Sequence, residues 1–160
     1  MAEMALKLKK IGKIVHTDEG CSIVVDKTYA AALIGLAGFS HIQILWWFSE
    51  CDNATDRRNL IEEKPYQTSP AILGTFATRS PKRPNPIALD TVQVTFIDHE
   101  NATIGLTWLD AFDGSPVLDI KPYTPSLDRV ENPLVPNWCR HWPKCYEASG
   151  EFDWEREMNS

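Results

Sequence analysis

The residues best suited to chemistry lie in one proline-rich segment, residues 74–89. Arg79 and Arg83 carry planar guanidinium groups that stay charged and present several donors in a fixed geometry. Asn85 adds a donor and an acceptor on one short side chain. Three prolines fix φ and remove backbone donors, so they stiffen the segment as a loop: Pro81, Pro84 and Pro86. A stiff loop with fixed polar groups loses little freedom on binding, which predicts a small-ligand site; the alternative is a solvated basic turn between two strands.

A second polar cluster is the Asp-Gly-Ser-Pro sequence at residues 113–116. An Asp-Gly pair favours a tight turn, and the exposed amides of such a turn can bind the polar edge of a ligand. Asp119 and Lys121 follow two residues apart, and therefore on one face of a strand. The alternative interpretation is turn chemistry beside an ordinary surface ion pair.

Three residues late in the chain have the chemistry of zinc ligands: Cys139, His141 and Cys145. A zinc site needs a fourth ligand, and the sequence offers none nearby, so we expect packed or exposed side chains and no metal. The sequence shows neither a serine-histidine-aspartate order nor a carboxylate pair that indicates glycosidase or protease chemistry. The clusters therefore favour binding and positioning over strong acid–base catalysis.

Composition limits the class of protein. The chain has 160 residues, of which 43% are hydrophobic and 24% charged, as in an ordinary globular protein. No apolar run approaches the length of a membrane span, and the charged start lacks the apolar core of a signal peptide. We therefore expect a cytoplasmic location, no membrane contact and four reduced cysteines. The net charge of −6 argues against a broadly basic nucleic-acid surface, although local basic clusters leave an RNA substrate possible.

Short strands at hairpin spacing must position the two clusters. They are predicted at residues 11–15, 21–25, 41–48, 72–78, 88–97, 104–108 and 117–120. No long amphipathic helices separate them, which argues against a doubly wound α/β fold. The pattern predicts a mainly β protein: a single antiparallel β-barrel of about six or seven strands with short helical turns. We expect one domain over residues 1–160, with its core at about 11–125 and an irregular C-terminal arm at 126–160.

The clearest strand is the one predicted over residues 41–48. Ile42, Ile44 and Trp46 fall on one face of it, and apolar residues also occupy the other face. A strand that is apolar on both faces is typical of the middle of a covered sheet. We expect core packing for Trp46 and also for Trp108 in a later strand.

Three blocks of the sequence, at residues 33–42, 76–89 and 113–123, resemble the TsaA-like or TrmO-like family in their order and spacing. The resemblance covers about residues 11–125. It implies a compact β-barrel that forms a homodimer and binds S-adenosylmethionine near the subunit interface. It also implies methylation of the exocyclic amino group of threonylcarbamoyl-adenosine, beside the anticodon of threonine tRNA.

The resemblance also implies roles for individual residues. The cofactor-binding positions are Arg79, Leu89, Asp113, Gly114, Ser115 and Pro116, together with Ser49 and Glu50 after the aromatic strand. Within this hypothesis three further arginines bind an anionic substrate such as RNA: Arg57, Arg58 and Arg83. Asn85 is assigned to catalysis, where it orients the acceptor by hydrogen bonding.

The chain departs from the family pattern in two places that bear on its substrate. Many members have histidine and glutamine where this chain has Ser49 and Glu50, and residues 15–20 lack the family's Pro-Arg-Gln stretch. The long C-terminal extension of the tRNA enzyme is also replaced by a Trp- and Pro-rich tail. Two alternatives therefore stand beside the tRNA methyltransferase. One is a methyltransferase for a small metabolite or another RNA, and the other is a non-catalytic, dimeric S-adenosylmethionine-binding module.

Overall fold

A computed structural model describes residues 4–159, and this part of the chain forms two compact units. The first unit contains the described residues up to Ser49 together with Ile87–Pro125. The second contains Glu50–Pro86 and the described residues from Ser126 onward. The assignment of residues 1–160 to one domain stays a prediction.

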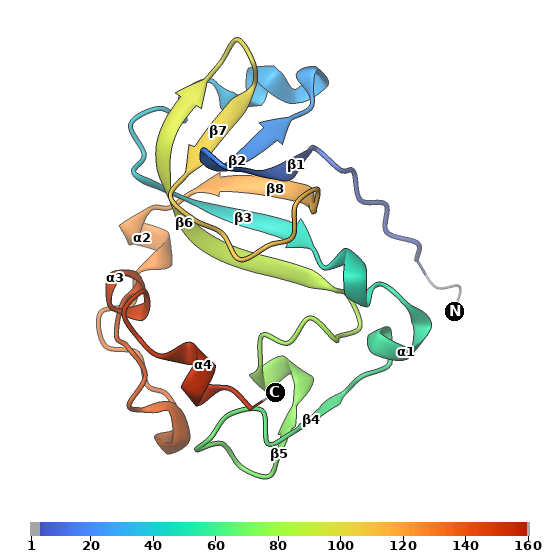
Figure 1. The fold of residues 1–160 in the computed structure, drawn as a ribbon, viewed down its shortest axis with the longest axis vertical. Helices are drawn as coiled ribbons and strands as arrows, with labels where there is room; N and C mark the ends of the chain where they lie inside the picture. Colours follow the sequence, from blue (N-terminus) through green and yellow to red (C-terminus); the bar gives the residue numbers. More distant parts are fainter. Residues whose placement is uncertain (1–3, 160) are drawn as a thin grey trace. The chain divides into compact units, whose positions relative to one another are not determined.

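The first unit is a closed antiparallel β-barrel, which confirms the predicted fold class (Figure 1). Its six strands are neighbours in the order β1-β2-β7-β6-β3-β8. Their bounds are β1 (Gly12–Thr17), β2 (Gly20–Val25), β3 (His41–Trp47), β6 (Ile87–Asp98), β7 (Thr103–Leu106) and β8 (Pro116–Pro122). Closure leaves no free edge among these strands, so the ladder partners satisfy their backbone groups.

The alternation of β3 builds the core of the barrel. Ile42 and Ile44 are completely buried, and Trp46 is 4% exposed on the same face. The indole Nε1 of Trp46 donates to Oδ2 of Asp90 at 2.7 Å, so the polar edge of a buried ring is satisfied. Burying each isoleucine stabilises the fold by about 1.5–3 kcal/mol.

The expectation of core packing for Trp108 is wrong. Its side chain is 67% exposed, because β7 ends at Leu106 and the strand alternation does not continue to residue 108. Leu109 is 2% exposed and packs in the core instead.

A 3₁₀ helix, η1 (Lys27–Leu33), connects β2 to β3. Gly35 and Gly38 follow with φ of 85° and 101°, values that glycine adopts readily. A pocket of about 260 Å³ lies in this unit between η1 and β8, lined mostly by apolar side chains and by Asp119. None of the predicted cofactor residues lines it.

The second unit has little regular structure. Its two-stranded antiparallel sheet pairs β4 (Ile61–Glu63) with β5 (Ile72–Gly74). The short helices outside the barrel are η2 (Ser49–Cys51), α1 (Ala54–Arg57), η3 (Thr75–Ala77), α2 (Pro125–Asp128), η4 (Asn137–Cys139), α3 (Tyr146–Ser149) and α4 (Trp154–Glu157). No helix among the described residues is both long and apolar enough to cross a membrane.

The strand predicted at residues 72–78 is only partly correct. β5 ends at Gly74, η3 occupies residues 75–77, and Thr78 follows as its C-cap. The backbone N–H of Thr75 still donates to the Leu60 carbonyl at 2.9 Å, whereas that of Thr78 donates back to the Thr75 carbonyl at 3.0 Å. The local turn therefore replaces the ladder just before the proline-rich loop.

Candidate cofactor site

The turn at residues 113–116 is held against β1 by backbone hydrogen bonds. Gly114 has φ of 83° and its N–H donates to the Ile14 carbonyl at 2.7 Å. The N–H of Ile14 in turn donates to the Ser115 carbonyl at 2.9 Å. A Cβ added at Gly114 would meet nothing within 4 Å, so the space beside this residue is open. The turn is therefore preformed. The expectation that its amides are exposed to a ligand is wrong for Gly114 and Ser115, because their N–H groups donate to the Ile14 and Phe112 carbonyls.

His16 adds two further contacts between β1 and this turn. Its backbone N–H donates to Oδ1 of Asp113 at 2.8 Å, and its ring Nε2 lies 2.6 Å from the Ala111 carbonyl. Because a carbonyl oxygen only accepts, Nε2 carries the hydrogen. One carboxylate oxygen of Asp113 is thus used to orient the turn. Reasoning from the sequence missed His16, because no local pattern links two residues that are 97 positions apart.

Ser115 and Leu89 complete the predicted cofactor residues of the barrel. Ser115 is 7% exposed, and its hydroxyl donates to the Phe112 carbonyl at 2.7 Å, which closes the turn from inside. Pro116 opens β8 and pairs with Lys13 of β1. Leu89 lies on β6 opposite Leu45 and is 44% exposed, so it presents apolar surface to solvent.

The proline-rich loop of the second unit is built around Arg83. Its guanidinium donates to three backbone carbonyls of the loop: Thr75 at 3.2 Å, and Thr78 and Ser80 at 3.3 Å. Asn59 supports the same loop, because its amide nitrogen donates to the Lys82 carbonyl at 3.0 Å. Arg83 therefore organises the loop, and its predicted contact with substrate stays a prediction.

Arg79 is positioned by a residue that the sequence did not single out, Tyr66. The backbone N–H of Arg79 donates to the Tyr66 hydroxyl. Burial of this hydroxyl raises the pKa of Tyr66, against the lowering effects of the Arg79 hydrogen bond and charge. The phenol therefore stays neutral. Arg79 itself is exposed, whereas the preceding residue, Thr78, is buried.

Arg57 and Asn85 are brought together. One guanidinium nitrogen of Arg57 lies 2.9 Å from Oδ1 of Asp52, and the other donates to Oδ1 of Asn85 at 3.3 Å. Asn53 caps α1 by accepting from the Asp56 N–H at 2.9 Å, which fixes the start of the helix that carries Arg57. The contact directs the carboxamide oxygen of Asn85 toward Arg57.

Three other predicted residues lie at the surface. Arg58 is exposed at the end of α1, and Ser49 and Glu50 are exposed in η2. Two of the zinc-like residues have other partners: His141 contacts Glu157, and the thiol of Cys139 donates to the Pro136 carbonyl at 3.5 Å. Across residues 4–159, no three His, Cys, Asp or Glu side chains gather as a metal site.

The first unit thus assembles Leu89 and residues 113–116 on a closed barrel, and the second assembles Arg57, Arg79, Arg83 and Asn85 around a stiff loop. These features place the protein in a class of small antiparallel β-barrel proteins that carry a preformed turn on the barrel and an arginine-bearing loop outside it. Residues 11–129 match the family model described as the tRNA-methyltransferase O N-terminal domain, and the chain belongs to this family.

Individual relatives agree with this assignment. An S-adenosyl-L-methionine-binding protein of Archaeoglobus fulgidus is 38% identical over 114 residues, covering 71% of this chain and 76% of the relative. The human tRNA (adenine(37)-N6)-methyltransferase is 36% identical over 105 residues, covering 66% of this chain and 23% of that protein. A crystal structure of TrmO from Pseudomonas aeruginosa superposes with a TM-score of 0.65 at 25% identity, covering 85% of this chain and 62% of that one. The chain therefore spans about a quarter of the human relative and less than two thirds of the solved structure.

Proposed function

We propose that this chain is an S-adenosylmethionine-dependent methyltransferase that N-methylates a modified adenosine, threonylcarbamoyl-adenosine, in tRNA. The observation that carries the proposal is the family membership of residues 11–129, a region that includes both the Asp113 turn and the Arg79 loop. The names of the archaeal and human relatives support the cofactor and the class of reaction.

Asp113 is the polar group of the barrel that fits the adenosine part of the cofactor. The turn at residues 113–116 offers its second carboxylate oxygen beside the open space at Gly114, while the N–H groups of Gly114 and Ser115 are already bonded to the Ile14 and Phe112 carbonyls. A carboxylate accepts the hydrogen bonds that a ribose hydroxyl or an adenine amino group donates. Leu89 offers apolar surface on which the face of the adenine ring can pack.

Arg79 fits the other end of the cofactor, its amino-acid carboxylate. A guanidinium binds a carboxylate through two parallel hydrogen bonds, and it keeps its charge at every physiological pH. Ser49 and Glu50 are proposed as further polar contacts of the cofactor, Glu50 suited to its ammonium group.

When bound, the cofactor supplies an activated methyl group on a positively charged sulfur. The chain's task is then to hold the acceptor amine in line with that methyl group and to exclude water. Asn85 is proposed to orient the acceptor. Because Arg57 holds its Oδ1, its amide nitrogen is the group available to donate to the acceptor.

Contact with tRNA is proposed for Arg57, Arg58 and Arg83. The net charge of −6 means that binding must depend on such a local cluster rather than on the whole surface. The cytoplasmic location expected from the sequence stays a prediction.

A homodimer is the assembly that we propose for this chain. Large apolar side chains on and beside the β4–β5 sheet are mostly exposed in the single chain: Leu60, Ile61, Ile72 and Phe76. An exposed patch of this kind is typical of an interface. Sedimentation should give a dimer for the wild type and a monomer for Ile72→Asp, and a monomeric wild type would contradict the assembly.

The decisive experiment combines cofactor binding with nucleoside analysis. We expect calorimetry to detect S-adenosylmethionine binding to the wild type, about tenfold or more weaker binding to Arg79→Ala, and unchanged binding to the exposed control Arg129→Ala. Incubation with bulk tRNA should then add one methyl group to threonylcarbamoyl-adenosine. Equal affinities of wild type and Arg79→Ala would refute the assigned role of Arg79.

A second candidate, methylation of a small metabolite, is favoured by one observation. Two of the three arginines assigned to RNA contact their own unit, since Arg83 binds loop carbonyls and Arg57 binds Asp52. The dependence of substrate binding on salt separates the candidates. RNA affinity falls steeply as salt rises because phosphate contacts release counterions, whereas the affinity of a small uncharged substrate does not.

A further inference from the structure

The C-terminal tail contributes an aromatic cluster that contacts Tyr66 within the second unit. The ring of Trp138 stacks on that of Tyr66, with 5.5 Å between centroids and 16° between planes. Trp142 meets the same ring edge-on at 4.9 Å, and Trp154 packs against Trp142 at 5.1 Å. Such pairs stabilise by about 0.5–1.5 kcal/mol beyond the burial of their area. Tyr66 is therefore held on two sides by the tail.

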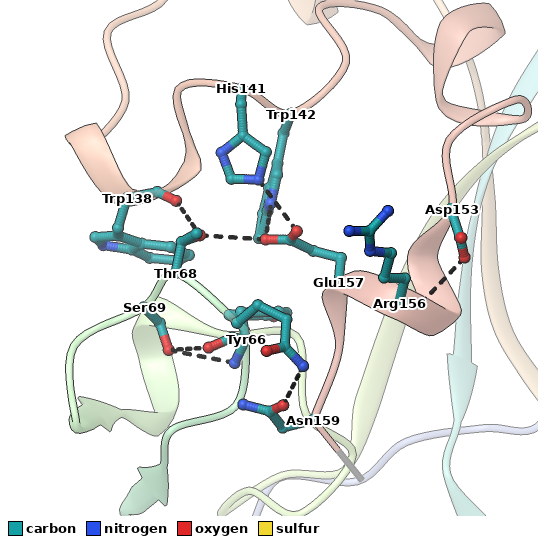
Figure 2. A network of polar contacts seen from close by, with 11 residues as sticks. Tyr66, Thr68, Ser69, Trp138, His141, Trp142, Asp153, Arg156, Glu157 and Asn159 are labelled. Carbon is teal, nitrogen blue, oxygen red and sulfur yellow. Dashed lines mark hydrogen bonds and ion pairs between the residues drawn. The ribbon is translucent and has the colours of Figure 1, made fainter.

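Glu157 fixes the orientation of this cluster (Figure 2). Its side chain accepts from Nε1 of Trp142 at 2.8 Å and from Nε2 of His141 at 3.1 Å, and the residue is only 8% exposed. The hydroxyl of Thr68 lies 3.3 Å from the same carboxylate, but its hydrogen is directed to the Trp138 carbonyl at 2.6 Å. A buried carboxylate with two charge-assisted or polar donors is a strong local constraint.

The backbone of the tail also brackets the segment around Tyr66. The N–H of Gln67 donates to the Glu157 carbonyl at 2.8 Å, and that of Asn159 donates to the Pro65 carbonyl at 2.9 Å. Tyr66 and Met158 form an isolated antiparallel bridge between these two bonds. The tail therefore fixes both the backbone and the ring of Tyr66.

Tyr66 transmits this constraint to the proline-rich loop. Its hydroxyl accepts the backbone N–H of Arg79, the residue proposed to bind the cofactor carboxylate. The contacts thus form one continuous path from Glu157 through the tryptophans and Tyr66 to the Arg79 backbone.

We propose that the tail is a positioning element for cofactor binding: Glu157 and the tryptophans hold Tyr66, and Tyr66 sets the backbone at Arg79. The inference rests on the proposed role of Arg79 in the cofactor site. Tyr66 is a positioning residue, since it acts through Arg79 and not on the cofactor itself. The alternative is that the cluster only stabilises the second unit.

The first test measures amide hydrogen exchange in the cofactor-free protein. Tyr66→Phe keeps the ring and removes the acceptor, so we expect exchange at the Arg79 amide to accelerate about tenfold. Tyr146→Phe removes a hydroxyl from α3 of the same tail and should leave that amide unchanged. Unchanged protection in Tyr66→Phe would overturn the inference whether or not the protein binds S-adenosylmethionine.

The second test is a double-mutant cycle on S-adenosylmethionine affinity, measured by calorimetry. Tyr66→Phe should weaken binding about three- to tenfold in the wild type and have no further effect in the Arg79→Ala background. An equal loss in both backgrounds would show that Tyr66 does not act through Arg79. If Arg79→Ala alone has no effect, the proposed role of Arg79 fails, while the exchange measurement still decides whether Tyr66 positions the loop.

A third variant tests whether the tail itself affects the conformation of the Arg79 loop. Glu157→Gln removes the charge but retains one oxygen for Trp142, so we expect a smaller acceleration of exchange at Arg79, about threefold. Glu155→Gln, an exposed neighbour in α4, is the matched control. Circular dichroism checks that both variants fold. If folded Glu157→Gln shows wild-type exchange at the Arg79 amide, Glu157 does not influence the loop. The positioning role would then be limited to Tyr66.

Discussion

The two candidate binding elements of this chain are held in place by different kinds of contact. The turn at residues 113–116 is fixed by backbone hydrogen bonds to β1 and by the closure of the barrel behind it. The Arg79 loop is fixed by side chains, chiefly Arg83, Asn59 and Tyr66. Backbone ladders tolerate most substitutions of single surface side chains, whereas a loop built on side chains depends on each of them. We therefore expect the turn at residues 113–116 to keep its conformation after single substitutions that leave the barrel core intact. We expect the Arg79 loop to lose its conformation when one of its supporting side chains is replaced.

The largest effect that tests this comparison is a core truncation in the barrel. Ile44→Ala removes a completely buried side chain from β3, so we expect the free energy of unfolding to fall by about 2–5 kcal/mol. Urea denaturation measures the loss, and Leu127→Ala, at a residue that is 86% exposed, is the control. If both variants lose less than about 1 kcal/mol, β3 does not carry the core in the way described.

The next effect concerns Glu157 in the second unit. Glu157→Ala leaves the Trp142 and His141 donors without their acceptor, and we expect a loss of about 1–3 kcal/mol in the free energy of unfolding. A chemical denaturation series at neutral pH measures it. Glu155→Ala should change the stability little, because Glu155 is exposed.

The ionisation of Glu157 also predicts how the stability of the fold depends on pH. Burial alone would raise the pKa of Glu157, but hydrogen bonds from Trp142 and His141 outweigh it, so the pKa is lowered from the ordinary value of 4.5. The carboxylate therefore stabilises the folded state fully above that ordinary pKa, and the contribution is lost as the pH falls through the lowered pKa. Acid titration of tryptophan fluorescence should show a smaller pH-dependent loss of stability below 4.5 in Glu157→Gln than in the wild type.

A charge-conserving substitution sharpens the comparison further. Arg83→Lys keeps the positive charge but cannot reach three carbonyls with one planar fork, so the loop should loosen. We expect affinity for S-adenosylmethionine to fall about tenfold, while the salt dependence of tRNA binding stays as in the wild type. Arg129→Lys, at an exposed position without a proposed role in binding, is the matched control. Wild-type cofactor affinity in Arg83→Lys would mean that the carbonyl contacts do not organise the loop.

The sequence predicted those parts of the molecule whose causes are local. The alternation of Ile42, Ile44 and Trp46 identified a buried strand, and an Asp-Gly pair identified the turn at residue 113. The alternation gave wrong predictions where a strand ends early, at Trp108 and in residues 75–78. A periodic pattern does not mark the residue at which the hydrogen-bonded ladder stops.

The contacts that position the two candidate binding elements were not predictable in this way. The bond from His16 to Asp113 spans 97 positions, and the bond from Trp142 to Glu157 belongs to a tail without any helical or strand period. Such pairs are set by how the barrel closes and how the tail folds back on residues 64–68, and no single segment encodes either. The resemblance to a family supplied Arg79 and Asp113, but not the residues that hold them.

The smallest effect is expected at the barrel element, from His16. His16→Ala removes the ring hydrogen bond to the Ala111 carbonyl but retains the backbone N–H that donates to Asp113. Because the backbone bonds of Gly114 and Ile14 also remain, we expect affinity for S-adenosylmethionine to fall only about twofold to fivefold. Calorimetry measures it against His99→Ala, a substitution in the turn between β6 and β7. A loss larger than that of Arg83→Lys would reverse the comparison, since it would make a single side chain, and not the backbone ladder, the main support of the barrel turn.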